Sequence, residues 1–154
     1  MNERYSLVMF SKSILVLCLC LAASNVAYAD GSPIVGTWLV ESHYDITGDT
    51  KFLQSINKEK TMIGTTSRGQ TAYGIWRKVG NHDYQTKSTI IVGPDDPYGF
   101  PAGAVATFVS TGTYDKKSDT FTTSGTATWT FGENNDVLYQ DNYQSVFHRY
   151  TFDD

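Results

Sequence analysis

Few side chains of this 154-residue chain have the types and spacing that catalysis or metal binding requires. The three histidines, His43, His82 and His148, fall at spacings that match no local zinc motif. Both cysteines, Cys18 and Cys20, lie in an apolar N-terminal segment, so the rest of the chain offers no thiolate ligand, cysteine nucleophile or disulfide. We therefore expect no metal site and no cysteine chemistry.

The histidines differ in the surroundings that an alternating strand pattern predicts for them. His43 shares a strand face with Glu41 and Asp45, which indicates solvent. His82 falls in a turn. His148 alternates with apolar residues, so we expect it to face the interior. There it would be a wall residue bonded to a hydroxyl group rather than a catalytic base.

The adjacent carboxylates Asp95 and Asp96 form the remaining candidate for acid–base chemistry or calcium binding. Prolines flank them and no further series of oxygen ligands follows, which favours a solvated loop. The chain has no Gly-x-Ser-x-Gly elbow, P-loop or dinucleotide fingerprint. The sequence thus predicts no catalytic residue, no metal and no cofactor.

Residues 1–29 have the pattern of a cleavable signal peptide. A positively charged start precedes an apolar run at residues 14–23, and Ala27 and Ala29 form an A-x-A cleavage site. Because the run is well short of the ~20 residues that span a bilayer, we expect no stable membrane anchor. The sequence predicts an exported protein, periplasmic or secreted, in which residues 30–154 form one domain.

The charge balance argues against nucleic acid as a partner. Lys and Arg number 12 against 16 Asp and Glu, and the longest basic runs are the pairs Arg77–Lys78 and Lys116–Lys117. Binding to nucleic acid depends on neutralising phosphates with basic groups. The amino-acid sequence does not specify an oligomeric state.

A hydrophobic alternation with a period of two residues dominates from residue 35 onward. In Thr120–Phe131 the even positions carry hydroxyls, while the odd positions carry aromatics at the ends and small residues between, which is typical of a half-buried antiparallel strand. The other predicted strands, separated by turn residues, are 36–46, 51–56, 61–66, 71–79, 84–92, 105–114 and 143–152.

These short sequential strands predict an all-β fold, a single antiparallel up-and-down barrel of about eight strands. A barrel is favoured over a sandwich because closure removes exposed strand edges and the short turns join neighbouring strands. A barrel of eight strands encloses either a filled core or one small-ligand cavity.

Small and hydroxyl-bearing residues on the predicted inner faces favour a cavity, although bulky side chains from the opposite wall could also fill that space. Gly125 and Ala127 lie mid-strand between larger residues, and Thr86 and Ser110 lie on neighbouring strands. Aromatics with a few hydroxyls are typical of a small-molecule pocket. The predicted ligand-binding residues are Tyr84, Ser88, Tyr98, Phe100, Phe108, Trp129 and His148.

One connection, Gly93–Gly103, is longer than antiparallel pairing requires and is rich in proline and glycine. It carries the aromatic residues Tyr98 and Phe100, whose exposure to solvent would be unfavourable unless they packed against another group. We expect either a lid whose aromatics touch a ligand or a packed loop whose aromatics cap the core.

The element Gly36-Thr37-Trp38 resembles the start of the first barrel strand in the calycin group, which includes lipocalins, fatty-acid-binding proteins and avidins. Arg149, in the last strand, resembles the late arginine that packs over this tryptophan in lipocalins. The pattern from Tyr73-Gly74-Ile75-Trp76 through Gly80 to Tyr84, followed by Asp119-Thr120-Phe121, also looks like small bacterial lipocalin-like proteins of undefined activity. The resemblance implies a lipocalin-like barrel whose base is closed by Trp38 and Arg149, with a cavity for a small apolar molecule.

The leading functional hypothesis is therefore an exported barrel that holds a small apolar or amphipathic ligand. An enzyme of the cyclase or isomerase type on the same scaffold is the alternative, and a structural or host-interaction protein with a filled core is the third. An ionisable group inside the cavity would favour the enzyme, and a filled interior would favour the structural role.

The signal sequence gives the first testable prediction. After export the protein should begin at Asp30 and be soluble, which intact-mass measurement and N-terminal sequencing of the exported protein would check. Membrane-bound protein that still carries Met1 would contradict it.

Overall fold

The computed structural model describes residues 31–66, 69–96 and 98–151. Contacts divide the chain into two units, Met1–Ser32 and Pro33–Asp154, and the description below concerns the second unit. The predicted signal peptide lies outside the described residues. No helix in the described part of the chain is long and apolar enough to cross a membrane.

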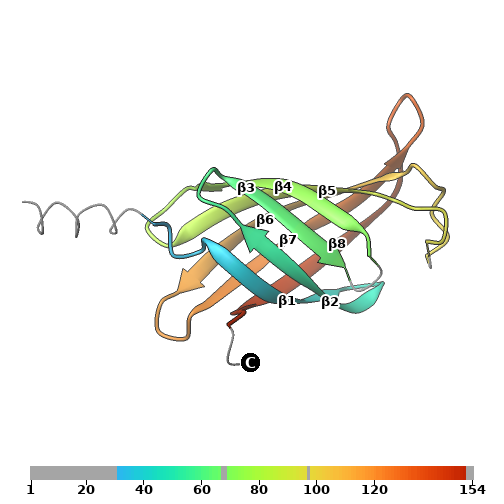
Figure 1. Cartoon of the computed structure of the whole chain (residues 1–154). Coiled ribbons are helices and arrows are strands. Elements are labelled where there is room, and N and C mark those ends of the chain that lie inside the picture. Colours follow the sequence, from blue (N-terminus) through green and yellow to red (C-terminus); the bar gives the residue numbers. More distant parts are fainter. Residues whose placement is uncertain (1–30, 67–68, 97, 152–154) are drawn as a thin grey trace, which may run out of the picture. The chain divides into compact units, whose positions relative to one another are not determined.

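Eight antiparallel strands form one closed barrel, in which each strand pairs with its neighbours in sequence and the last pairs with the first (Figure 1). This confirms the predicted all-β barrel. The strands are β1 Gly36–Tyr44, β2 Gly48–Ile56, β3 Thr61–Thr66, β4 Thr71–Lys78, β5 Asp83–Ile91, β6 Val105–Asp115, β7 Thr120–Phe131 and β8 Asp136–Arg149.

The main difference in strand boundaries is at β8, which begins at Asp136 rather than at the predicted Tyr143. Its first residues pair with the end of β7 and form a long hairpin that contains a register shift between Trp129 and Thr130. The consecutive exposed residues Val137 and Leu138 break the alternation there, so the sequence pattern missed this part of the strand.

The inward face of β8 is formed by Asp141, Tyr143, Ser145 and Phe147, which are buried. The prediction that His148 faces the interior is wrong, because His148 is exposed on the outer surface. Side chains alternate across a strand, so His148 and its neighbour Arg149 cannot both lie on the face that contacts Trp38.

The connections alternate between the two ends of the barrel, as an up-and-down topology requires. The end that carries the β2–β3, β4–β5 and β6–β7 turns is called the closed end, and the other is called the mouth. The closed end is filled by an apolar cluster in which Tyr84 makes edge contacts with Trp76 and Phe121, at 5.9 and 5.7 Å between ring centroids. The cluster consists of Ile34, Trp38, Val40, Ile56, Met62, Trp76, Tyr84, Tyr114, Phe121 and Phe147.

Trp38 and Arg149 stack at the closed end, with the guanidinium carbon 3.9 Å from the ring centroid. Trp38 is fully buried and donates its indole N–H to the Ile34 carbonyl at 2.8 Å. Arg149 donates to the carbonyls of Pro33 and Val35 at 2.7 and 2.8 Å. The guanidinium thus ties the segment before β1 to the end of β8.

Asp119, in the β6–β7 turn, accepts two hydrogen bonds from the same guanidinium, at 3.0 and 3.2 Å. These bonds lower the pKa of the Asp119 carboxyl. Gly36 completes the arrangement, because it has φ +145° and a side chain there would collide with the guanidinium. The Gly-x-Trp element therefore has a local physical cause: glycine leaves room for the arginine that covers the tryptophan.

Trp38→Ala should destabilise the protein by roughly 3–5 kcal/mol, because it removes a fully buried aromatic side chain and leaves a cavity under Arg149. Urea unfolding followed by circular dichroism would measure this. The control is Tyr73→Ala, which removes an aromatic side chain that is 65% exposed and should cost less than about 1 kcal/mol. Equal midpoints for Trp38→Ala and the unaltered protein would contradict the structural role of the stack.

Candidate binding cavity

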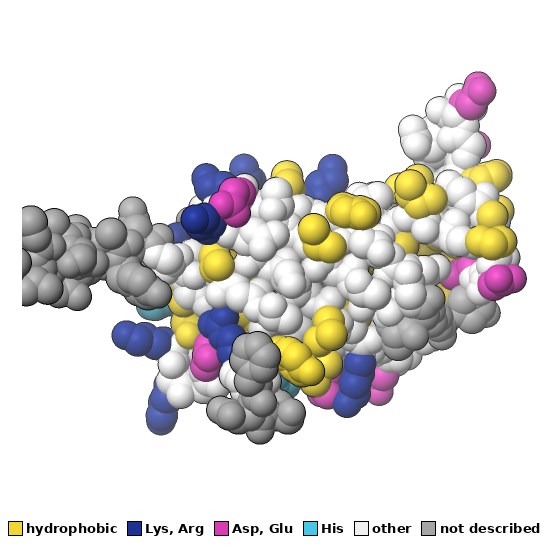
Figure 2. All heavy atoms as spheres, viewed as in Figure 1, with side chains coloured by type: hydrophobic (Ala, Val, Ile, Leu, Met, Phe, Trp, Pro, Cys, Tyr) yellow, Lys and Arg dark blue, Asp and Glu magenta, His cyan; other side chains and the backbone are white. Residues whose placement is uncertain are grey.

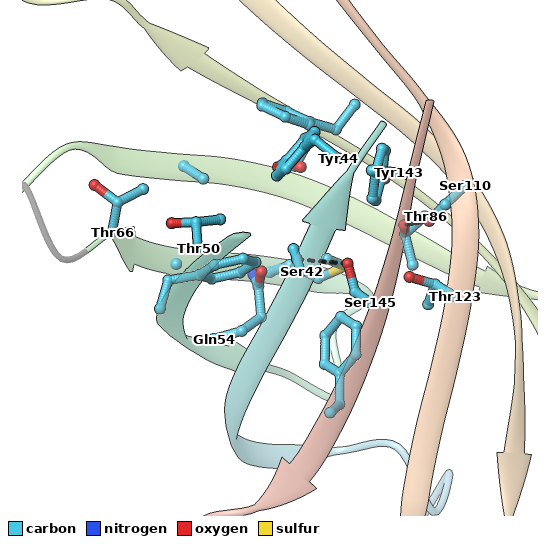
Figure 3. A pocket seen from close by; sticks show the side chains of 17 residues that line it. Ser42, Tyr44, Thr50, Gln54, Thr66, Thr86, Ser110, Thr123, Tyr143 and Ser145 are labelled. Atoms are coloured by element: carbon cyan, nitrogen blue, oxygen red, sulfur yellow. Dashed lines mark hydrogen bonds between the residues drawn. The ribbon is translucent and has the colours of Figure 1, made fainter. Parts of the chain in front are cut away.

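A set of buried polar residues lies in the interior of the barrel, although hydroxyl and amide groups are unfavourable in a core unless they are hydrogen-bonded. Two hydroxyl pairs satisfy each other: Ser42 with Ser145 at 2.6 Å (Figure 3) and Thr86 with Ser110 at 2.7 Å. The set, here called the polar belt, consists of Ser42, Gln54, Thr86, Ser110, Thr123 and Ser145, one residue each from β1, β2, β5, β6, β7 and β8.

All six belt residues line an inner chamber of about 70 Å³. The small residues Gly64, Ala72 and Ser88 leave room on the walls formed by β3, β4 and β5. Its 17 described lining residues, drawn in Figure 3, include no Lys, Arg, His, Asp or Glu. They are Ser42, Tyr44, Thr50, Phe52, Gln54, Met62, Gly64, Thr66, Ala72, Thr86, Ser88, Phe108, Ser110, Thr123, Tyr143, Ser145 and Phe147.

Gln54 is the unusual member of the belt. It is only 4% exposed, and its amide nitrogen is buried with no hydrogen-bond partner. Its amide oxygen lies over Gly64 of the neighbouring strand, where a side chain would come within 3.1 Å of it. Buried polar groups are nearly always paired, so a free donor on a cavity wall calls for an explanation.

Tyr44 and Tyr143 lie side by side toward the mouth, with ring centroids 5.5 Å apart. Burial raises the pKa of both phenols, and for Tyr143 a hydrogen bond with Ser110 opposes part of that rise. Both side chains are therefore neutral at ordinary pH. Tyr44, together with Thr50, Thr66 and Phe108, also lines a second chamber.

This outer chamber lies toward the mouth and has a volume of about 80 Å³. The two chambers share the lining residues Tyr44, Thr50, Thr66 and Phe108, which form a narrow waist between them. Its described lining residues are Tyr44, Thr47, Thr50, Thr66, Gln70, Ile90, Val92, Asp96, Tyr98, Ala106, Phe108 and Trp129.

The long connection between β5 and β6 covers the outer chamber. Phe100 stacks on Trp129, with ring centroids 5.2 Å apart and planes 16° from parallel, and it also contacts Tyr139. Tyr98 lines the chamber and is 45% exposed. Asp96 holds the loop in shape, since one carboxylate oxygen accepts the backbone N–H groups of Tyr98 and Phe100 at 3.0 and 3.2 Å.

Asp141 is a buried carboxylate at the mouth end of β8 and is 3% exposed. One of its oxygens accepts the backbone N–H groups of Ile46 and Thr47, at 3.3 and 3.2 Å, and so fixes the β1–β2 turn. The Tyr139 hydroxyl donates to the same oxygen at 3.4 Å. Asp141 belongs to neither chamber wall as described.

The structure places five of the seven predicted ligand-binding residues at or beside the two chambers. Ser88 and Phe108 line the inner one, Tyr98, Phe108 and Trp129 line the outer one, and Phe100 packs behind Trp129. Tyr84 instead belongs to the closed-end cluster, and His148 lies outside the barrel.

The prediction that the small residue Gly125 leaves space for a cavity is wrong. A side chain there would collide with the Val109 carbonyl and come within 2.7 Å of the Ser110 backbone, so glycine allows β6 to approach closely. Sequence reasoning also missed Gln54 as a site residue. The signal was present, because Gln54 alternates with the apolar Phe52 and Ile56 in a predicted strand.

Comparison with known proteins gives little beyond this geometry. No family model matches the chain, and no curated protein matches it. A solved structure described as "Structure of EF1p2_mFAP2b bound to DFHBI" is similar with 14% sequence identity and a TM-score of 0.49. The match covers 77% of this chain and 94% of that chain.

Asp96→Ala should loosen the loop at the mouth without unfolding the barrel. It removes two backbone hydrogen bonds to a carboxylate, so amide hydrogen exchange at Tyr98 and Phe100 should rise roughly tenfold. Asp95→Ala is the matched control, because it makes the same charge change at an exposed neighbouring position. If both variants exchange alike, Asp96 does not order the loop.

Proposed function

We propose that this protein is an exported, lipocalin-like barrel that binds one small amphipathic molecule in its interior. The observation that carries the proposal is the buried, unpartnered amide nitrogen of Gln54, a residue that lines the inner chamber. A core that served only packing would leave neither the space nor the free donor.

The size of the two chambers limits the ligand. They measure about 70 and 80 Å³ and meet at a shared waist of Tyr44, Thr50, Thr66 and Phe108. Together they are comparable with the roughly 150 Å³ apolar cavity that admits benzene in another protein. A molecule of about one ring therefore fits this space only if it spans the waist, and a longer one requires the waist side chains to move.

The lining favours binding over catalysis. The inner chamber has no histidine or carboxylate among its described lining residues, and His148 is outside. The carboxylate of Asp96, which lines the outer chamber, accepts two backbone N–H groups of its own loop. General acid–base chemistry needs such a group within hydrogen-bond reach of the substrate. The closed-end cluster, the belt above it and a second apolar cluster toward the mouth instead match a typical small-molecule pocket. The second cluster consists of Val92, Ala104, Ala106, Ala127, Trp129 and Tyr143.

Filling the inner chamber tests the proposal. Ala72 lines it and is 7% exposed, so Ala72→Leu should occupy the space and lower affinity at least tenfold for one-ring compounds. Calorimetric titration with toluene, benzyl alcohol and acetophenone would measure this. We expect at least one compound to bind the unaltered protein saturably at one molecule per barrel.

The matched control is Thr71→Leu, which adds a leucine on the exposed face of the same strand and should bind like the unaltered protein. Thermal unfolding of Ala72→Leu checks that the barrel remains folded. The proposal fails if no compound binds, or if folded Ala72→Leu binds as tightly as Thr71→Leu.

A further inference from the structure

We infer that the inner chamber selects an uncharged molecule carrying a hydrogen-bond acceptor, such as a ketone, ester or ether oxygen, and that Gln54 donates its amide N–H to this oxygen. The inference rests on the proposed function and specifies the ligand class. It follows from the polarity of Gln54, the neutrality of the chamber and the charge distribution around the mouth.

The position of the Gln54 amide indicates which ligand group it meets. Its oxygen lies over Gly64, toward β3, and its nitrogen is the buried atom that has no partner. The hydroxyls of Ser42 and Ser145, and those of Thr86 and Ser110, are hydrogen-bonded to each other. The buried group of Gln54 that has no partner is a donor, so an acceptor on the ligand is its complement.

A charged ligand group would have no counter-ion in the inner chamber. Its described lining residues include no basic side chain for a carboxylate and no acidic side chain for an amine. The two phenols are neutral, because burial raises their pKa. Moving an unpaired charge into such a space is far more costly than burying a neutral polar group that gains a hydrogen bond.

The outside of the barrel also disfavours anions. Basic groups outnumber acidic ones near the closed end, whereas acidic groups predominate at the mouth (Figure 2). Among the described residues, the closed end carries Lys58, Lys60, Arg77, Lys78, Lys116, Lys117 and Arg149 beside Glu59, Asp83, Asp115 and Asp119, and the mouth carries Asp45, Asp49, Asp95, Asp96, Glu133 and Asp136 beside Lys51. A negative field at the entrance slows the approach of an anionic amphiphile and leaves a neutral one unaffected.

A set of probes with similar shape separates these contributions. Acetophenone has one ring and a carbonyl acceptor, cumene has nearly the same shape without an acceptor, and benzoate carries a negative charge. For the unaltered protein we expect acetophenone to bind roughly three- to tenfold more tightly than cumene, the usual effect of one hydrogen bond. Benzoate at pH 7 should bind at least tenfold more weakly than acetophenone.

Gln54→Met removes the donor and keeps a side chain of similar length. The affinity for acetophenone should therefore fall to that for cumene, while the affinity for cumene should change little. Gln144→Met is the matched control on the exposed face of β8 and should alter neither affinity. The side-chain NH₂ signals of Gln54, followed by ¹⁵N NMR, should shift with acetophenone and not with cumene. This measurement and the probe comparison use the unaltered protein, so they hold even if Gln54→Met does not fold.

The outcomes distinguish the inference from the proposed function. If cumene binds as tightly as acetophenone, or if benzoate binds best, the chamber still binds small molecules but the selection for a neutral acceptor is wrong. If Gln54→Met folds and binds both acetophenone and cumene more weakly by the same factor, Gln54 shapes the chamber without recognising the acceptor. If neither neutral probe binds the unaltered protein, both proposals fail.

Discussion

The pairing of β8 with β1 is the constraint on which the rest of the structure depends. It removes the two strand edges that an open sheet would expose, and it brings Arg149 opposite Trp38 in the register. From there the guanidinium reaches the ring of Trp38, the carbonyls of Pro33 and Val35, and the carboxylate of Asp119. One side chain joins three segments that are distant in sequence, in a barrel that contains no cysteine.

The closed end gives the barrel a rigid base, and this base permits a less efficiently packed interior above it. The aromatic cluster around Tyr84 and Phe121 is buried and apolar. The polar belt that follows replaces apolar contacts with hydroxyl pairs and leaves the Gln54 donor unsatisfied. Such a belt stabilises the fold less than hydrocarbon of the same volume would.

The two ends of the barrel differ in the interactions that a molecule would have to break to enter the interior. Entry at the closed end would disrupt the Trp38–Arg149 stack and the core beneath it. At the mouth, the cover is a loop held by backbone hydrogen bonds to Asp96 and by the stacking of Phe100 on Trp129. Since these interactions are few and partly exposed, we expect the mouth to open at a lower free-energy cost than the closed end.

Local alternation in the sequence determined the fold class, most strand positions and the inward faces of β1 and β7, because the pleat of a strand ties burial to a period of two residues. The stacking of Trp38 and Arg149 was predicted through a family resemblance. Where the pattern weakened, as at the start of β8, the strand was missed, and His148 was assigned to the wrong face.

Only the tertiary structure decided which inward residues enclose space and which fill it. Tyr84 and Phe108 both face inward, yet Tyr84 packs into the closed-end cluster while Phe108 borders both chambers. Gly125 is small because a neighbouring strand approaches it, and Gln54 is buried with its amide oxygen over Gly64 and its amide nitrogen without a partner. The physical reason is that alternation specifies the side of the sheet on which a residue lies. A cavity depends on how side chains from different strands meet across the barrel, and that depends on register and closure.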